Sequence, residues 1–312
     1  MSEAVAKAAA RLWGLPEHRV QLAARRENSV YHVDHDAGYA LRLHREGYRS
    51  DAQLVSELRW MAALEAQGMQ VPRPIPSRSG LLVERVEGVQ VDVLTWLPGQ
   101  MLGKQGALDG VRDRGALVHQ LGGLLAQLHD ISDAWVPDAG FTRPRWDAAG
   151  LVGDQPLWDR FWLHPDLTAS ETALFLAARD QARLDLAALQ APDFGLIHAD
   201  AITENLMLHE GRLSLIDFDD GGFGYRDFDV ATFLFRQIAA PDYVELRTAL
   251  LDGYSPRRHI DAQSLDLFLM LRSLTYPGWI IARLHEPGGA ERSARAIAQA
   301  LPLARAYLEG ST

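Results

Sequence analysis

The pattern of apolar residues changes near residue 98, and this change constrains the fold more than any other feature of the sequence. Up to that point, apolar and polar residues alternate over short runs, which is the pattern of half-buried strands. These runs cover residues 20–24, 29–33, 39–44, 81–86 and 89–97. One helix is predicted among them, over residues 51–67, because apolar residues recur at helical spacing after a capping serine.

The remainder of the chain favours helices. Long amphipathic segments cover residues 114–128 and 168–189, and the sequence from Asp227 onward has a mostly helical pattern. The two halves together predict an α+β fold with two lobes, a small antiparallel-sheet lobe over residues 1–97 and a larger, mostly helical lobe over residues 98–312. With 312 residues, of which 47% are hydrophobic, the chain can bury a core of this size.

The composition argues against several functional classes. The chain has no cysteine, so neither a disulfide nor a thiol nucleophile can operate. Its formal net charge of −10 disfavours a nucleic-acid partner. No apolar run approaches the ~18 residues of a membrane span, and the first residues do not have the pattern of a signal peptide. We expect a soluble cytoplasmic protein with no membrane partner, and the sequence leaves its oligomeric state open.

The strongest chemical signal is a pair of short apolar runs that flank the turn Glu210-Gly211. This arrangement predicts a hairpin, which places Asn205 at the start of its first strand beside Asp217 at the end of its second. An amide oxygen and a carboxylate suit Mg²⁺, a cation that prefers oxygen ligands. Asp200 lies on the loop that leads into the hairpin, within reach of a hydroxyl beside a metal-bound phosphate.

The order of these residues resembles the catalytic loop and metal-binding turn of protein kinases, in His198-Ala199-Asp200, Asn205 and Ile216-Asp217-Phe218-Asp219. The match is closer to the aminoglycoside phosphotransferase and choline kinase family, nearest its branch of homoserine kinase-like enzymes and a bacterial stress-response kinase. Residues 224–231 are also similar to a segment of that family. The resemblance implies a protein kinase-like fold and transfer of the γ-phosphate of ATP to a hydroxyl. It implies that Asp200 is the catalytic residue and that Asn205 and Asp217 hold Mg²⁺.

The resemblance also implies a nucleotide site in the first lobe, but its usual phosphate-binding lysine is missing. The chain has two lysines, Lys7 and Lys104, and neither lies on the third predicted strand. Arg42 lies on that strand, so we expect it to contact nucleotide phosphates. Glu57 is its expected partner, because it interrupts the apolar face of its helix and needs a counter-charge. The alternatives are a solvated Arg42, and Arg45 on the opposite face of the strand as the phosphate ligand.

Two further segments are predicted to contact the nucleotide. The turn 26–29 lies where kinases have a glycine-rich loop, yet it contains no glycine. Its backbone N–H groups or the side chains of Asn28 and Ser29 are the expected phosphate contacts, and an ordinary hairpin turn is the alternative. Thr95, Trp96 and Leu97 fit the hinge between the lobes, where backbone groups bind adenine. Because such a hinge recognises purines through the backbone, GTP is an alternative to ATP.

Asp219 and Asp220 add negative charge next to the expected metal ligand. We expect them to attract a cation, either a second metal ion or an amino group of the substrate. This favours an amino alcohol or an amino acid as the hydroxyl acceptor. Aromatic residues on helical segments, among them Trp158, Tyr276 and Trp279, are candidates to line the acceptor pocket, and core packing is the alternative for each.

Three other interpretations are open. A strand followed by Asp217-Phe218-Asp219 also matches the opening of haloacid dehalogenase-like phosphatases, but that family needs a later lysine, and none follows Lys104. The glycine-free turn, Arg42 and Ala199, where relatives usually carry glycine, are compatible with a nucleotide-binding pseudokinase. The same fold also occurs in kinases whose acceptor is a protein serine or threonine.

Overall fold

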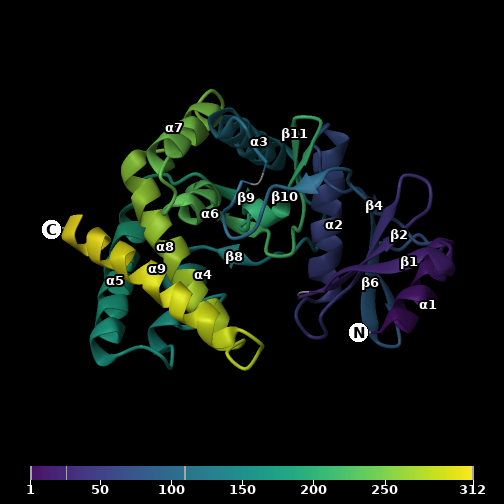
Figure 1. Ribbon diagram of the computed structural model, residues 1–312, viewed down its shortest axis with the longest axis horizontal. Coiled ribbons are helices and arrows are strands. Elements are labelled where there is room, and N and C mark those ends of the chain that lie inside the picture. The colour runs from purple at the N-terminus through teal and green to yellow at the C-terminus, as the bar shows by residue number, and fades with distance from the viewer. Residues whose placement is uncertain (1, 26, 109, 311–312) are drawn as a thin grey trace. The chain divides into compact units, whose positions relative to one another are not determined.

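The computed structural model describes residues 2–25, 27–108 and 110–310 (Figure 1). Contacts between residues divide the chain into two compact units. The first unit comprises Met1–Leu102, Asp130–Arg143 and Glu204–Asp219, and the second comprises Gly103–His129, Pro144–Thr203 and Asp220–Thr312. The first unit therefore includes two segments from later in the chain, and the proposed lobe boundary at residue 97 stays a prediction.

The first unit is built around an antiparallel sheet with the strand order β1-β2-β3-β6-β4, in which β5 also pairs with β6. Its strands are β1 (Val20–Arg25), β2 (Ser29–Val33), β3 (Tyr39–Leu43), β4 (Pro74–Ile75), β5 (Glu84–Val86) and β6 (Val89–Thr95). The strands predicted over residues 20–24, 29–33, 39–44 and 89–97 are confirmed to within two residues at each end. Of the strand predicted over residues 81–86, only Glu84–Val86 is a strand, and β4 was not predicted. The register places Arg42 of β3 directly opposite Asp92 of β6.

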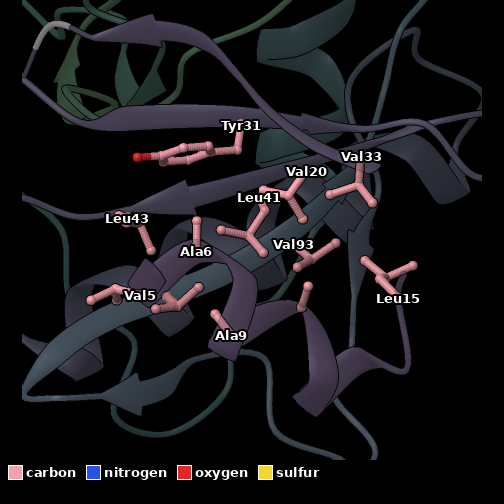
Figure 2. Close-up of a cluster of buried hydrophobic side chains, with 12 residues drawn as sticks. Val5, Ala6, Ala9, Leu15, Val20, Tyr31, Val33, Leu41, Leu43 and Val93 are labelled. Carbon is pink, nitrogen blue, oxygen red and sulfur yellow. The ribbon is translucent and has the colours of Figure 1, made fainter. Parts of the chain in front are cut away.

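Helix α1 (Glu3–Trp13) packs on this sheet and closes its core (Figure 2). The helix begins after Ser2, whose side chain accepts a hydrogen bond from the N–H of Val5, and it ends at Gly14 in the left-handed conformation. Small and aliphatic side chains of the helix meet strand residues such as Tyr31 and Leu41. The sequence analysis did not predict this helix. A turn of 3-10 helix, η1 (Glu17–Arg19), leads from it into β1.

Helix α2 (Asp51–Ala66) and a hairpin complete the first unit. The helix starts with a capping box in which Ser50 and Gln53 exchange hydrogen bonds, as its predicted start requires. The hairpin consists of β10 (Leu206–His209) and β11 (Arg212–Leu215), and β7 (Gln100–Met101) pairs with β10. Gly99, before β7, has φ 111°, and a Cβ there would come within 2.5 Å of the carbonyl oxygen of Leu208, so this approach requires glycine.

The second unit combines a small sheet with most of the helices. In the sheet, β12 (Gly222–Tyr225) pairs in parallel with β8 (Arg145–Trp146) and antiparallel with β9 (Phe194–Ile197). The helices are α3 (Arg114–Ala134), whose last turn belongs to the first unit, α4 (Ala148–Val152), α5 (Ala169–Ala188), α6 (Arg226–Gln237), α7 (Tyr243–Tyr254), α8 (Ala262–Ile281) and α9 (Gly289–Gly310). The 3-10 turn η2 (Phe161–Leu163) lies between α4 and α5, and a second 3-10 turn, η3 (Thr203–Asn205), begins at the last residue of the segment Pro144–Thr203 and continues into the first unit.

Helix α8 is the central helix of the second unit. It packs against both α6 and α9 (Figure 1), and most of its side chains from Leu265 onward are buried. The predicted α+β class with antiparallel sheets is confirmed. Among the residues that the structure describes, no helix is both long enough and apolar enough to cross a membrane.

Candidate active site

The candidate metal ligands Asn205 and Asp217 lie at the open end of the β10–β11 hairpin. Leu206 pairs with Leu215, and the N–H of Ile216 donates to the carbonyl oxygen of Asn205 at 3.0 Å. The predicted hairpin is therefore confirmed. Asp217 comes immediately after Ile216, which is bonded to Asn205. Asn205 is buried, whereas Asp217 is exposed.

The backbone at Asp217 adopts an unfavourable conformation. Its φ of 66° lies in the left-handed region, which aspartate enters more readily than most residues with a Cβ but still at a cost. Phe218, the next residue, is fully buried and packs edge-on against Trp60 of α2, with ring centroids 5.2 Å apart. Such strain persists only where the surroundings hold the backbone. The buried phenyl ring thus anchors the turn that presents the Asp217 carboxylate.

Arg143 provides a second anchor for this turn. Its Nη2 donates to the carbonyl oxygens of Phe218 at 2.8 Å and Asp219 at 2.6 Å, and its Nη1 lies 3.3 Å from a carboxylate oxygen of Glu57. Arg49 also donates to the carbonyl oxygen of Asp219, at 2.9 Å. Sequence analysis missed Arg143, because it lies 75 residues from Phe218 along the chain. Glu57 of α2 is thereby linked to the turn that carries Asp217.

Arg42 is buried, so its interpretation as a solvated strand residue is wrong. Its Nη1 donates to Glu57 at 2.8 Å, which forms the predicted pair. Its Nε and Nη2 donate to the two carboxylate oxygens of Asp92, both at 2.7 Å. His44 Nε2 also lies 2.7 Å from Asp92. Asp92 was not predicted, although the β3–β6 register places it opposite Arg42.

The buried charges of this network stabilise one another. Burial alone would raise the pKa of Glu57, but Arg42 and Arg143 outweigh it and hold that pKa below its usual value. Burial opposes ionisation of Asp92 in the same way, and Arg42 and His44 hold its pKa well below the usual range. Glu57 and Asp92 are therefore both ionised at neutral pH.

Asp219 has a different environment from Asp217. Its side chain is buried, and burial together with Glu57 raises its pKa, against the opposite effect of Arg49 and Arg143. One of its carboxylate oxygens lies 3.6 Å from Nε of Arg49. A substrate amine or second metal ion at Asp219 would thus compete with an arginine of the same unit.

The turn before β2 is bonded to Arg45, which follows β3. Asn28 accepts a hydrogen bond from the N–H of Arg45 at 3.1 Å, and Arg45 pairs with Glu27 at 2.7 Å near the surface. Ser29 is buried. Arg26, the first residue of the predicted turn, lies outside the described residues. The contact of Asn28 and Ser29 with phosphate stays a prediction.

The predicted hinge residues continue from β6. The N–H of Thr95 donates to the carbonyl oxygen of Arg73 at 2.9 Å, and the N–H of Trp96 donates to that of Gly38 at 3.0 Å. The Trp96 ring packs against His32, with centroids 4.4 Å apart. The N–H groups of Thr95 and Trp96 are therefore already bonded within the unit, and the contact of these three residues with adenine stays a prediction.

In the second unit, Asp200 follows a tightly held segment. Asp229 of α6 accepts hydrogen bonds from the N–H groups of His198 at 2.8 Å and Ala199 at 2.6 Å. His129 Nε2 lies 3.0 Å from the same carboxylate. Burial would raise the pKa of Asp229, but His129 and His198 outweigh it and lower that pKa. Ala199 has φ 64°, a conformation that favours glycine, and the ionised Asp229 holds it there.

The other predicted site residues of the second unit make contacts with residues of the same unit. Asp200 is paired with Arg272 of α8 at 2.7 Å, a partner that sequence analysis did not identify. Asp220 is half-buried, and its carbonyl oxygen accepts a hydrogen bond from Trp146 Nε1 at 2.8 Å. The ring of Trp279 is covered by the guanidinium of Arg283, 4.2 Å from the ring centre. The substrate roles of Asp220 and Trp279 stay predictions.

Comparison with known proteins decides the family. A model of the phosphotransferase enzyme family matches residues 18–268. The chain belongs to this family. It is 30% identical to a homoserine kinase of Xanthobacter autotrophicus over 242 residues, which are 74% of this chain and 69% of that protein. It is 25% identical to amicoumacin kinase of Bacillus subtilis over 297 residues, which are 88% of this chain and 83% of that protein.

Solved structures confirm the kinase-like fold of this phosphotransferase. A microcompartment-associated aminopropanol kinase has a TM-score of 0.85 and 29% identity, and the match covers 99% of this chain and 98% of the other. An amicoumacin kinase bound to AMP-PNP and Ca²⁺ has a TM-score of 0.79 at 22% identity, with 96% and 93% covered. The predicted enzyme class, a phosphotransferase acting on an alcohol group, is confirmed. The phosphatase interpretation is wrong.

Proposed function

We propose that this phosphotransferase uses ATP and Mg²⁺ to phosphorylate the hydroxyl of a small molecule that also carries an amino group. The observation that carries the proposal is the hairpin, at whose open end Ile216 is bonded to Asn205 and is followed by Asp217. The substrate class is supported by the names of two relatives, since homoserine and aminopropanol each combine a hydroxyl with an amine. The half-buried carboxylate of Asp220 is suited to such an amine.

Asn205 and Asp217 would hold the Mg²⁺ through an amide oxygen and an exposed carboxylate. Among the described residues, no three His, Asp or Glu side chains form a group that could hold a metal ion. Two protein ligands suit Mg²⁺, which usually takes the rest of its oxygen ligands from water and substrate phosphates. When bound, the ion would offset the negative charge that develops on the transferred phosphoryl group.

Asp200 would orient the acceptor hydroxyl and take up its proton as the hydroxyl attacks the γ-phosphate. A guanidinium has five N–H donors, and three nitrogen atoms of Arg42 each donate one bond to Asp92 or Glu57. We assign the remaining donors of Arg42 to the non-transferred phosphates. In the hinge, the N–H donor to adenine would be that of Leu97, because the N–H groups of Thr95 and Trp96 donate elsewhere.

A phosphate-transfer assay tests this function. Purified protein, ATP and Mg²⁺ are mixed with 1-amino-2-propanol, ethanolamine or homoserine, and with 2-propanol as a matched alcohol without an amine, and ADP is measured. We expect at least one amino alcohol to be phosphorylated at about tenfold or more the rate of the matched alcohol, because the amine would pair with a carboxylate that the matched alcohol leaves unpaired. Equal rates would remove the amine from the proposal. Transfer to protein serine or threonine, with none to any small molecule, would favour the protein kinase alternative.

A further inference from the structure

Arg272 is a buried cation in the middle of an apolar helix. It lies on α8 and is fully buried. Its Nη2 donates to Asp200 at 2.7 Å and to the hydroxyl of Tyr276 at 3.1 Å, and its Nη1 donates to the carbonyl oxygen of Ala199 at 3.3 Å. Burial alone would lower the pKa of Arg272, but Tyr276 and Asp200 outweigh it and raise that pKa. The side chain is therefore a permanent cation next to Asp200.

Aromatic rings fix the orientation of this cation. The guanidinium carbon of Arg272 lies 4.9 Å from the ring centre of Trp158, 4.8 Å from that of Tyr276 and 5.6 Å from that of Phe228. A cation that is attracted to several ring faces is held in one orientation, and removal of water strengthens the attraction. Trp158 and Tyr276 were candidates to line the acceptor pocket, and in the structure their rings lie against a cation of the chain itself.

The segment from His198 to Asp200 is held from two sides. The carboxylate of Asp229 accepts the N–H groups of His198 and Ala199, while Arg272 donates to the carbonyl oxygen of Ala199 and to the carboxylate of Asp200. Ala199 needs such support, because its left-handed backbone is unfavourable for a residue with a Cβ. Loss of Arg272 would release both the Ala199 peptide and the Asp200 side chain.

We propose that Arg272 is a positioning residue that fixes the Asp200 carboxylate toward the acceptor hydroxyl. This inference rests on the proposed function, in which Asp200 acts on that hydroxyl. Reactive groups must be held within a fraction of an ångström, and a misplacement of about 1 Å costs about 10²-fold in rate. A lysine at this position keeps the charge but not the planar fork that reaches Ala199 and Asp200 together.

Arg179 offers a matched control. It is also buried, stacks on Trp162 at 4.0 Å, pairs with Asp154 at 2.7 Å and donates to the carbonyl oxygen of Val152. Replacing either arginine with methionine removes a stacked guanidinium and breaks one ion pair. Only the change at Arg272 alters the surroundings of Asp200.

The kinetic test compares Arg272→Met, Arg272→Lys and Arg179→Met in the transfer assay. We expect Arg272→Met to lower kcat about 10²-fold with KM for ATP within about 3-fold, the pattern of an interaction that acts on the chemical step. Arg272→Lys should recover part of the loss, and Arg179→Met should keep kcat within about 3-fold of wild type. A folded Arg272→Met protein with wild-type kcat would overturn the proposal.

A second measurement does not depend on the acceptor. Backbone amide exchange at Ala199 and Asp200 is compared in the same variants, below their melting temperatures. Because Arg272 holds this segment, we expect about tenfold faster exchange in Arg272→Met and no change in Arg179→Met. If the wild type phosphorylates no acceptor, the proposed function fails, and the exchange still decides the inference. Unchanged exchange in Arg272→Met would overturn the positioning role.

Discussion

We expect Asp200→Asn to lower kcat by about 10³-fold while nucleotide affinity stays within about 3-fold of wild type. Asparagine keeps the size of the side chain and can still meet Arg272, but it cannot accept the proton of the acceptor hydroxyl. Positioned general-base groups contribute about 10²–10⁴-fold to rate, so the loss belongs in the chemical step. The measurement is kcat and KM in the transfer assay, together with an ATP titration of the variant.

Asp154→Asn is the matched control for this prediction. Asp154 accepts a hydrogen bond from the guanidinium of Arg179 at 2.7 Å, as Asp200 does from that of Arg272. Asp154→Asn and Asp200→Asn therefore each neutralise the acidic member of an arginine–aspartate pair. We expect the control to keep wild-type turnover. Unchanged turnover in Asp200→Asn would remove the catalytic role from Asp200. A parallel loss of ATP binding would move its role from the chemical step to the nucleotide site.

The second large effect concerns stability. We expect Arg42→Met to lower the free energy of unfolding by about 3–5 kcal/mol, because Asp92 and Glu57 would remain buried without their main counter-charge. Arg42→Lys should lose less, since it keeps the charge but not the bidentate contact with Asp92. Arg45→Met is the control, because its pair with Glu27 is partly exposed and contributes about 0–1 kcal/mol. Urea unfolding measures all three.

The same network predicts a pH dependence. The folded-state pKa values of Glu57 and Asp92 are lowered, so their contribution to stability is fully present above their unfolded values and is lost as pH falls below about 4. In Arg42→Met both carboxylates lose the largest of the charges that lower their pKa values, so this acid-dependent loss should shrink. A loss of less than about 1 kcal/mol in Arg42→Met at neutral pH would contradict a structural role for Arg42.

Sequence reasoning succeeded where the signal was local. The hairpin of Leu206–His209 and Arg212–Leu215 follows from apolar runs around one turn, and Asp51–Ala66 follows from its cap and helical spacing. Helix α1 was missed because three of its four buried residues are alanine, and alanine gives a weak apolar stripe. The pairing of Arg42 with Glu57 was found because a charge on an apolar helix face requires a partner.

The partners that sequence reasoning missed are all distant in the chain. Asp92 meets Arg42 through strand register, and the contacts of Arg143 with Phe218 depend on how the first unit is packed. Arg272 did carry a signal, since this cation lies between the apolar run of residues 267–271 and the apolar Leu274. That pattern predicts a buried counter-charge but cannot identify Asp200 as the partner.

An ATP titration by calorimetry tests the magnesium-dependent kinase account most directly. It is run with and without Mg²⁺ on the wild type, on Asp217→Asn and on Glu210→Gln, which neutralises a carboxylate in the turn of the same hairpin. The account predicts binding that requires Mg²⁺, weakens about tenfold or more in Asp217→Asn and is unchanged in Glu210→Gln. ATP binding that is indifferent to both Mg²⁺ and Asp217 would contradict the account and favour a nucleotide-binding pseudokinase.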